Sequence, residues 1–507
     1  MLKFERVKIK SEDPDERVKT FDVEPIIGYS DNEAYAEGSR CIGCNICTQA
    51  CPASLDIGGY VNSTAVHDPG QTVRIVFENL PFPAIIGRVC THLCEDICVL
   101  YDTGGPIAIR HIKRYAADKF ENYGDVLQLP KKRFIGKHVA IIGGGPSGLS
   151  AAYYLSIQGV KVTLYEELPV LGGFMRVGIP KYRLPHDVIE KETGFIVSQG
   201  VDVYLNTKIG KDIEFEEIMN SHDAVYLGIG NHKPRMTGTP GSDATNIMHA
   251  TEFLKRTALE EEVNVGKNVV VIGGGFTAND ASRTSIRLGA ENVYIMYRRR
   301  DVDRPGYPSM NADEEMEETM EEKVTYMWEV TPFEYSKVGD RITEVKYWQN
   351  EMVPEGRGRA KPVPKKDKIL SKEVDFVIEA TGQESDYSFL GEKYMRMLKL
   401  TPQGQTITDP NGMTSIPGVF SGGDSTNISR DLISAVRDAD TAVLGILRYL
   451  NVMDQVNEEV LPFLDRWKKI LTNICQSHIR RKAKVNFFEL IKSSVRLEIV
   501  FILFHNK

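Results

Sequence analysis

The sequence predicts an α/β protein in which a helical, cysteine-rich N-terminal domain precedes two domains built on parallel sheets. Three features carry this prediction: a crowded set of cysteines near the start, and two later glycine-rich turns that each lie between short apolar runs. A chain of 507 residues is long enough for about three domains. The net charge of −8 gives no support for nucleic-acid binding, and no apolar run reaches membrane-spanning length.

Seven of the eight cysteines lie in two short segments of the N-terminal region. The first segment has the C-x2-C-x2-C-x3-C-P spacing of bacterial ferredoxins. Zinc sites more often show paired C-x2-C knuckles, so we favour iron–sulfur clusters over zinc or free thiols. A pair of [4Fe–4S] clusters needs one ligand more than these cysteines provide. The expected metal ligands are Cys41, Cys44, Cys47, Cys51, Cys90, Cys94 and Cys98.

The start of the chain carries little structural signal. Residues 1 to about 35 are polar and predict an arm or loop, and their charge is unlike that of a signal peptide. Clustering of the cysteines favours metal binding over disulfides, which together with the missing signal peptide predicts a cytoplasmic protein. The stretch 106–123 is expected to be helical and basic, and a linker near residue 130 leads into the next domain.

The first glycine-rich turn follows the apolar run 138–142 and has the spacing G-x-G-x-x-G. Glycine at these positions permits a tight turn, lets a pyrophosphate approach the backbone, and lets helix and strand pack closely. An acid about 20 residues on, at the end of the next strand, can accept hydrogen bonds from ribose hydroxyls. This Rossmann-like pattern predicts dinucleotide binding rather than an ordinary glycine-rich turn, and the acid suits FAD. The residues concerned are Gly143, Gly145, Pro146, Ser147, Gly148 and Glu166.

Three further segments are expected at the carboxyl ends of strands, where open α/β sheets bind ligands. The loop after Glu166 contains two arginines that are candidate phosphate or ribityl contacts. One later strand ends in Ala-Thr-Gly, and another ends in Gly-Gly-Asp and opens a helix. The Gly-Gly-Asp segment suggests that one flavin domain is interrupted by the second nucleotide unit. The candidate residues are Gly173, Phe174, Arg176, Arg183, Ala380, Thr381, Gly382, Gly423 and Asp424.

The second glycine-rich turn follows the apolar run 268–272 and has the spacing G-x-G-x-x-A. The strand behind it ends in arginines instead of an acid. Guanidinium groups bind a 2′-phosphate with bidentate geometry, whereas a carboxylate would repel it, so NADP is favoured over NAD. The alternative is that these arginines form only a solvated strand end. The candidate residues are Gly273, Gly275, Phe276, Thr277, Ala278, Arg298, Arg299 and Arg304.

Two later segments complete the pattern. The acidic run 312–326 is expected to be an amphipathic helix feeding a strand, with its acids on a solvated face. From about residue 451 the α/β pattern ends, and the basic segment after Arg466 carries the isolated Cys475. We expect a helical appendage or tail there, with partner or membrane-surface binding by a basic amphipathic helix as the alternative.

The order of these motifs over roughly residues 30–450 resembles the small subunit of NADPH-dependent glutamate synthase. It is also similar to the electron-input half of dihydropyrimidine dehydrogenase and to the large subunit of NADH-dependent ferredoxin:NADP oxidoreductase. The resemblance implies two N-terminal [4Fe–4S] clusters, FAD in the first nucleotide fold and NAD(P)H in the second. It implies that one cluster binds Cys41, Cys44, Cys47 and Cys98, and that the other binds Cys51, Cys90 and Cys94.

Two positions depart from the family's pattern. The family completes the second cluster with a Gln or Glu in the helix after the last cysteine, where this chain has Lys113. The eighth ligand therefore stays open between His111, a solvent molecule and a partner. The sequence Arg304-Pro305-Gly306 also stands where the family has Met-Pro-Ala, which could alter the nicotinamide site.

The resemblance implies a cluster domain at 1–130, an FAD domain at 131–255 with 370–450, an NAD(P)H domain at 256–369 and an appendage at 451–507. The implied activity is electron transfer from NADPH through FAD and the clusters to a partner protein in a hetero-oligomer. The expected partner is a glutamate synthase large subunit, with ferredoxin or another complex subunit as the alternative. No side-chain catalyst is expected, because the flavin mediates hydride transfer. A non-catalytic redox scaffold is the alternative from a different class.

Overall fold

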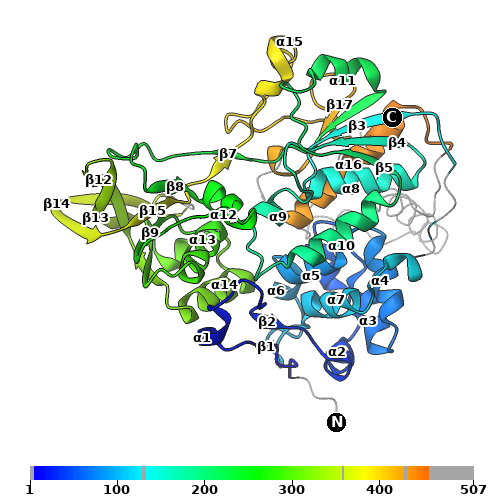
Figure 1. Cartoon of the computed structure of the whole chain (residues 1–507). Helices are drawn as coiled ribbons and strands as arrows, with labels where there is room; N and C mark the ends of the chain where they lie inside the picture. Colours follow the sequence, from blue (N-terminus) through cyan, green and yellow to red (C-terminus); the bar gives the residue numbers. More distant parts are fainter. Residues whose placement is uncertain (1–4, 128, 130–132, 357–358, 427–430, 456–507) are drawn as a thin grey trace. The chain divides into compact units, whose positions relative to one another are not determined.

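The computed structural model describes residues 5–127, 129, 133–356, 359–426 and 431–455 (Figure 1). All of these lie within one compact unit, residues 1–462. Most of the expected appendage at 451–507, with Cys475, lies outside the described residues. Among the described residues, no helix is long and apolar enough to cross a membrane.

The N-terminal helical unit, residues 5–125, is a set of short helices that are capped by local side chains. Asp56 and Asp68 each accept a hydrogen bond from a backbone N–H at the start of the helix that follows. Gly87 lets two helices pack closely, because a Cβ there would lie 2.6 Å from the Cα of Arg114. The elements are β1 (Lys10–Ser11), α1 (Pro14–Arg17), β2 (Ile26–Ile27), α2 (Asp31–Gly38), η1 (Ile46–Ala50), α3 (Ile57–Ala65), α4 (Pro69–Phe77), α5 (Pro83–Val89), α6 (Leu93–Asp96), α7 (Ile109–Asp118) and η2 (Tyr123–Asp125).

The first α/β unit has a five-stranded parallel sheet of order β17-β6-β3-β4-β5. The central strands are buried on both faces, which is why they appear as continuous apolar runs. Its strands are β3 (His138–Ile142), β4 (Lys161–Tyr165), β5 (Val201–Tyr204), β6 (Ala224–Leu227) and β17 (Val419–Ser421). Its helices are α8 (Pro146–Ile157), α9 (Phe174–Val177), α10 (His186–Val197), α11 (Phe215–Ser221), η4 (Ser388–Leu390), α15 (Gly391–Met395), η5 (Gly423–Ser425) and α16 (Leu432–Tyr449).

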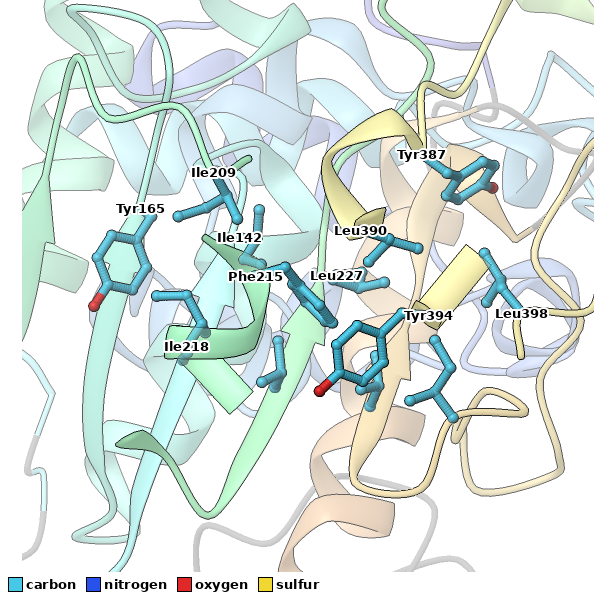
Figure 2. Packing of buried hydrophobic residues seen from close by; sticks show 14 residues of the cluster. Ile142, Tyr165, Ile209, Phe215, Ile218, Leu227, Tyr387, Leu390, Tyr394 and Leu398 are labelled. Carbon is cyan, nitrogen blue, oxygen red and sulfur yellow. The ribbon is translucent and has the colours of Figure 1, made fainter. Parts of the chain in front are cut away.

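One hydrophobic cluster packs on a face of this sheet and brings together segments that are distant in sequence. Ile142 and Leu227, from neighbouring strands, pack in it with Phe215 of α11 and with Leu390 (Figure 2). Burial of large apolar side chains of this kind stabilises a fold by roughly 1.5–3 kcal/mol each. The segment 387–398 is thereby held on the first sheet, although it follows the second sheet in the chain.

The second α/β unit has another five-stranded parallel sheet, of order β11-β10-β9-β15-β8. A three-stranded antiparallel sheet, β12-β13-β14, is inserted before its last strand. The strands are β8 (Ile247–His249), β9 (Asn268–Ile272), β10 (Asn292–Tyr297), β11 (Thr325–Trp328), β12 (Val330–Val338), β13 (Arg341–Val353), β14 (Lys361–Glu373) and β15 (Phe376–Glu379). The helices are α12 (Ala250–Ala258), α13 (Phe276–Arg287), η3 (Asp301–Asp303) and α14 (Met310–Glu321). The short pair β7 (Lys233–Pro234) and β16 (Gln383–Glu384) spans the two connections between the α/β units.

The sheet orders confirm the predicted fold class, in which the first α/β unit is interrupted by the second. The second sheet nevertheless extends beyond the expected range of 256–369 at both ends, because it includes β8 and β15. Residues 376–379, expected with the first unit, pair with β9 and β8. A buried parallel strand has the same apolar pattern in either sheet, so the sequence pattern does not reveal which sheet it joins.

Candidate functional site

A cavity of about 980 Å³ lies where the three units meet. The first glycine turn, the start of α13 and the loop around α6 all contribute to its wall. Pockets for organic cofactors typically occupy roughly 300–1,000 Å³, so this cavity is at the upper end of that range.

The first glycine turn has the conformation that its spacing predicts. Gly143 has a φ of +102°, and a Cβ on it would lie 2.5 Å from the carbonyl oxygen of Gly228. A Cβ on Gly148 would lie 2.0 Å from the carbonyl oxygen of Gly143, so α8 packs directly against the turn. Gly145, Pro146 and Ser147 line the cavity, with the free N-terminus of α8 at its wall. This arrangement fits a bound pyrophosphate.

Glu166 is buried and lines the same cavity. Its carboxylate accepts hydrogen bonds from the backbone N–H groups of Gly144, at 2.6 Å, and Leu168, at 2.8 Å. Burial raises the pKa of Glu166, and the two backbone hydrogen bonds act against that rise. The side chain is therefore held at the end of β4, where a ribose hydroxyl could donate to it.

Residues distant in sequence complete this wall. Gly173 has a φ of +53°, and a Cβ on it would lie 2.8 Å from the Cα of Gly145, so two backbone segments touch. Phe174 stacks on His232 with a ring separation of 4.2 Å. Gly423 and Asp424 reach the same cavity after β17, and the side-chain amide of Asn231 donates to the carbonyl of Asp424 at 3.1 Å.

The two loop arginines contact acidic side chains. Arg183 lines the cavity but donates to Asp280 at 2.6 Å and also pairs with Glu315. Arg176 lies 3.7 Å from Glu190 and is absent from the cavity wall. The Arg183 guanidinium thus bridges the first α/β unit to Asp280 and Glu315, and its role as a phosphate contact stays a prediction.

The second glycine turn repeats the geometry of the first. A Cβ on Gly273 would lie 2.4 Å from the carbonyl oxygen of Ala380, which places the Ala-Thr-Gly segment beside the turn. Phe276 and Thr277, at the start of α13, line the large cavity. The other predicted residues of this group, Gly275, Ala278, Thr381 and Gly382, flank the turn without lining that cavity.

The arginines after β10 divide into two kinds. Arg298 is exposed and makes no ion pair with a described residue, and Arg299 donates to the carbonyl of Ala360 at 3.2 Å. Arg304 is buried, pairs with Asp313 and donates to the carbonyl of Asp301. The structure therefore leaves Arg298, with Arg299, as the cations available at the end of β10.

The cysteines separate into two sets. Cys41, Cys44, Cys47 and Cys98 line one small cavity, although Cys98 is far from the others in sequence. The second set is Cys51, Cys90 and Cys94, in which Cys90 lies close enough to the other two thiols to raise the pKa of each. Around it, Val89, Thr91 and Leu93 line the large cavity, which places this set next to the first glycine turn's binding wall.

Lys113 lies with the second set. Burial raises the pKa of the Cys51 and Cys94 thiols, and the nearby Lys113 ammonium acts in the opposite direction. Lys113 is itself buried, and burial together with Arg110 lowers the pKa of the neighbouring His111.

Among the described residues, no three His, Cys, Asp or Glu side chains converge as they would on a single metal ion. Cysteines that hold a cubane cluster stand around its corners and need not converge on one point. The sharing of one cavity by four thiols fits such a cluster better than it fits a single zinc ion.

Sequence reasoning missed part of the cavity wall. Gly228, Ile229 and Gly230 follow β6 and line the cavity, as do Val89, Thr91 and Leu93. The glycines directly after the buried strand β6 were a usable signal, because ligands bind at the carboxyl ends of such strands. The residues beside Cys90 and Cys94 carried no such signal.

Comparison with known families matches two segments. Residues 137–443 match the model of the pyridine nucleotide-disulphide oxidoreductases, and residues 17–125 match that of dihydropyrimidine dehydrogenase domain II, 4Fe-4S cluster. Among solved structures, FprA of Mycobacterium tuberculosis in complex with NADPH has a TM-score of 0.52 at 18% identity, over 66% of this chain and 89% of that one. This likeness shows the fold.

Curated relatives cover most of the chain. The glutamate synthase [NADPH] small chain of Escherichia coli is 31% identical over 84% of this chain and 93% of its own length. The beta subunit of the NADP(+)-dependent formate dehydrogenase of Moorella thermoacetica is 33% identical over 83% of this chain, which spans 62% of that subunit. The NADPH-Fe(3+) oxidoreductase subunit beta of Geobacter sulfurreducens is 31% identical over 84% of this chain and 68% of its own length.

These matches confirm the resemblance drawn from the motifs, over both the cysteine-rich unit and the two α/β units. The chain therefore belongs to the pyridine nucleotide-disulphide oxidoreductase family and, within it, to the oxidoreductases of the glutamate synthase small-chain type.

Proposed function

We propose that this chain transfers electrons from NADPH, through FAD and two [4Fe–4S] clusters, to a partner protein. The observation that carries the proposal is the single cavity whose wall combines the first glycine turn, the start of α13 and the residues around Cys90 and Cys94. A relay needs its donor, converter and acceptor to be adjacent, and this cavity brings their expected sites together.

The first α/β unit would hold FAD. The N-terminus of α8 and the glycine turn would bind the pyrophosphate, and Glu166 would accept from the ribose. Gly423 and Asp424 would contact the flavin side of the cofactor from η5. A bound flavin exchanges two electrons as hydride on one side and single electrons on the other, which no side chain of this site can do.

The second α/β unit would hold NADPH. Gly273 and Gly275 leave space for its pyrophosphate at the start of α13. Arg298 and Arg299 would bind the 2′-phosphate, since their guanidinium groups lie after β10 where an NAD-binding unit carries an acid. Phe276 and Thr277 lie between this turn and the large cavity, so the nicotinamide would enter from there.

The two cysteine sets would each hold a cluster. The second set is adjacent to the large cavity and would exchange electrons with the flavin first, while the first set, with partly exposed cysteines, would deliver them outward. Lys113 is buried beside the second set, and its positive charge would offset the negative charge of a thiolate-bound cluster.

The proposed partner is a glutamate synthase large subunit, because the small-chain relatives match this chain over nearly their whole length. Beta subunits of a formate dehydrogenase and of an NADPH-Fe(3+) oxidoreductase match it at similar identity, so another complex subunit is the second candidate. In either case the chain would act as the NADPH-oxidising subunit of a hetero-oligomer.

The decisive experiment is anaerobic. The purified chain is analysed for iron and flavin, then titrated with NADPH while visible and EPR spectra are recorded. We expect about eight iron atoms and one FAD per chain, flavin bleaching on addition of NADPH, and cluster signals on full reduction. A protein that contains neither flavin nor NADPH-dependent dye-reducing activity would contradict the proposal and favour a non-catalytic scaffold.

A further inference from the structure

The N-terminal strap, defined here as residues 13–24, contacts all three units of the chain. Glu24 forms ion pairs of 2.9 Å with Arg88 and with Arg114 of the N-terminal helical unit. Asp22 pairs with Lys181 in the loop between α9 and α10 of the first α/β unit. This segment was expected to be an arm or loop, whereas the structure uses it as a connection between units.

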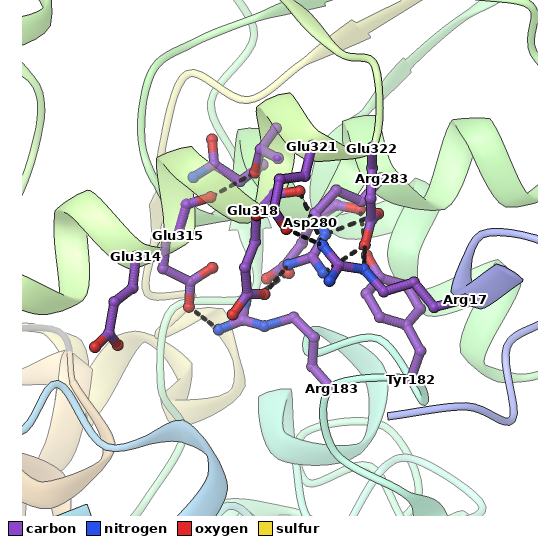
Figure 3. Close-up of polar contacts among 12 residues, drawn as sticks. Arg17, Tyr182, Arg183, Asp280, Arg283, Glu314, Glu315, Glu318, Glu321 and Glu322 are labelled. Carbon is purple, nitrogen blue, oxygen red and sulfur yellow. Dashed lines mark hydrogen bonds and ion pairs between the residues drawn. The ribbon is translucent and has the colours of Figure 1, made fainter. Parts of the chain in front are cut away.

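Arg17 is the contact of the strap with the second α/β unit. Arg17 is the last residue of the short helix α1. This helix forms despite its length because the Asp13 side chain caps its start and Pro14 occupies its first turn. The Arg17 side chain is fully buried and donates from Nε to Glu322 at 2.8 Å and from Nη2 to Glu321 at 3.0 Å. Figure 3 shows the guanidinium of Arg17 directed at the end of α14.

Glu322 forms ion pairs with three arginines. In addition to Arg17, it accepts from Arg283 at 2.7 Å (Figure 3). It also accepts from Arg287 at 2.6 Å, and both arginines are on α13. Burial alone would raise the pKa of Glu322, but the hydrogen bonds from the arginines outweigh burial and lower the pKa to about 2. The carboxylate is therefore ionised at neutral pH, and α13, α14 and the strap share one buried charge centre.

The first α/β unit reaches the same centre through Tyr182. The Arg287 guanidinium lies 3.6 Å from the centroid of the Tyr182 ring, at a distance typical of cation–π contacts. Phe21 of the strap lies 6.2 Å from the same ring. The buried Tyr182 ring is thus close to both the strap and α13.

The position of this centre bears on the nucleotide sites. Helix α13 begins at the second glycine turn, with Phe276 in the wall of the large cavity, and ends at Arg287 in the charge centre. Because a helix is rigid, fixing one of its ends determines the position of the other end. Contacts around Arg17 therefore influence where the nicotinamide site stands relative to the first glycine turn.

We propose that Arg17 is a positioning residue that latches the second α/β unit onto the other two and so sets the approach of the nicotinamide to the flavin. The inference rests on the proposed function for its kinetic consequence, but the latch itself is a property of the chain. Among the described residues, the hydrogen-bond partners of Arg17 do not line the cavity, so its removal should impair the geometry of hydride transfer more than the binding of NADPH.

The test compares Arg17→Gln with Lys19→Gln in the full-length, cofactor-loaded protein. Lys19 is a matched control, because it lies in the same strap but is exposed, and its ion-pair partner among the described residues is the nearby Glu16. Two quantities are measured: amide hydrogen exchange in α13 and α14, and flavin reduction as a function of NADPH concentration under anaerobic stopped-flow conditions.

For Arg17→Gln we expect about tenfold faster exchange in α14, because the variant leaves buried charges without a partner. We also expect the limiting rate of flavin reduction to fall about fivefold or more, with the NADPH dissociation constant changed less than about twofold. Lys19→Gln should match the wild type in both. Arg17→Lys should restore part of the rate, since an ammonium keeps the charge but cannot bridge both glutamates in the same way.

Unchanged exchange and an unchanged limiting rate in Arg17→Gln would overturn the latch, as would a change confined to the NADPH dissociation constant. If Arg17→Gln does not load flavin, Glu321→Gln replaces it, because this variant removes only the half-exposed partner of Arg17. The same changes, smaller in size, are then expected, and their absence would overturn the proposal. A wild-type protein that NADPH fails to reduce would contradict the proposed function, while the exchange measurement would still test the latch.

Discussion

At the scale of single residues, the arginines after β10 show that position along a strand does not determine the role of a charged side chain. Arg298 is exposed and unpaired among the described residues, while Arg300 pairs with Asp303 and Arg304 is buried against Asp313. An arginine that already pairs with a carboxylate must give up that contact before it can bind a phosphate. We therefore expect the choice of nucleotide to depend on Arg298 and Arg299.

The double substitution Arg298→Ala with Arg299→Ala should raise the KM for NADPH about tenfold while changing the KM for NADH much less, because only NADPH carries the 2′-phosphate. Steady-state reduction of a dye by each nucleotide measures the ratio of the KM for NADPH to the KM for NADH. Arg300→Ala is the matched control, since its guanidinium engages Asp303. An unchanged ratio in the double variant would show that these arginines form only a solvated strand end.

The acidic residues of α14 show the same dependence on context. The run 312–326 was expected to place its acids on a solvated face, but Glu315 and Glu322 are buried and paired with arginines. Amphipathic periodicity identifies the helix and cannot identify its neighbours. The expectation holds for Asp313, Glu317 and Glu321, which are exposed. It is wrong for Glu315 and Glu322, because cationic side chains of α13, the strap and the loop around Arg183 cover them.

At the scale of elements, the contact between α10 and α5 positions the second cysteine set. Glu192 of α10 accepts hydrogen bonds from the backbone N–H groups of Ala84 and Ile85, at 2.7 and 3.0 Å, and so caps α5 from another unit. Cys90 follows the end of the same helix. The cap therefore fixes Cys90, one of the proposed cluster ligands, relative to the first α/β unit.

This cap predicts a pH-dependent contribution to stability. Burial raises the pKa of Glu192 to about 7, although the hydrogen bonds from the backbone and from Tyr123 act to lower it. Because the pKa in the folded state exceeds the ordinary value of 4.5, this group's stabilising contribution is fully present below pH 4.5 and is lost as the pH rises through 7. Glu192→Gln has no such titration.

The wild type should therefore be more stable than Glu192→Gln at pH 5.5, and the difference in Tm should shrink toward pH 8. Thermal unfolding of both cofactor-loaded proteins across this range measures the difference. Asp187→Asn, on the first turn of the same helix, is the control and should show no comparable trend. A difference in Tm that stays constant with pH would contradict the assignment.

At the scale of the whole molecule, the arrangement of the cysteine sets predicts the order in which electrons pass through the proposed clusters. Cys98 joins Cys41, Cys44 and Cys47 in one cavity, whereas the second set is adjacent to the large cavity. Loss of the first set should therefore interrupt the exit of electrons without preventing their entry.

Cys98→Ser should lower the iron content from about eight to about four atoms per chain. NADPH should still bleach the flavin, while electron delivery to a protein acceptor should fall at least about tenfold, because the outer cluster is lost. Iron analysis, stopped-flow spectra and acceptor reduction provide the three readouts, and Cys475→Ser is the control cysteine. A complete loss of flavin bleaching would contradict the proposed order of the sets.

Much of this molecule could be predicted from local sequence. Glycine spacing requires the turns at Gly143 and Gly273, since a side chain there would overlap a carbonyl oxygen, and buried strands show as apolar runs. The family resemblance also implied the pairing of Cys98 with the first three cysteines, and the structure places these four around one cavity. Each of these features depends on a short segment or on a motif that recurs as a unit.

Only the tertiary structure decided which sheet receives β15, which acids pair with Arg183 and Arg17, and that one cavity joins three units. These outcomes depend on which surfaces meet after the elements have formed. A buried strand or a charged helix face has the same local pattern whatever packs against it, and the free energy that selects its neighbour comes from long-range burial and ion pairing. The sequence thus determined the cofactor-binding turns, and tertiary packing decided how they face one another.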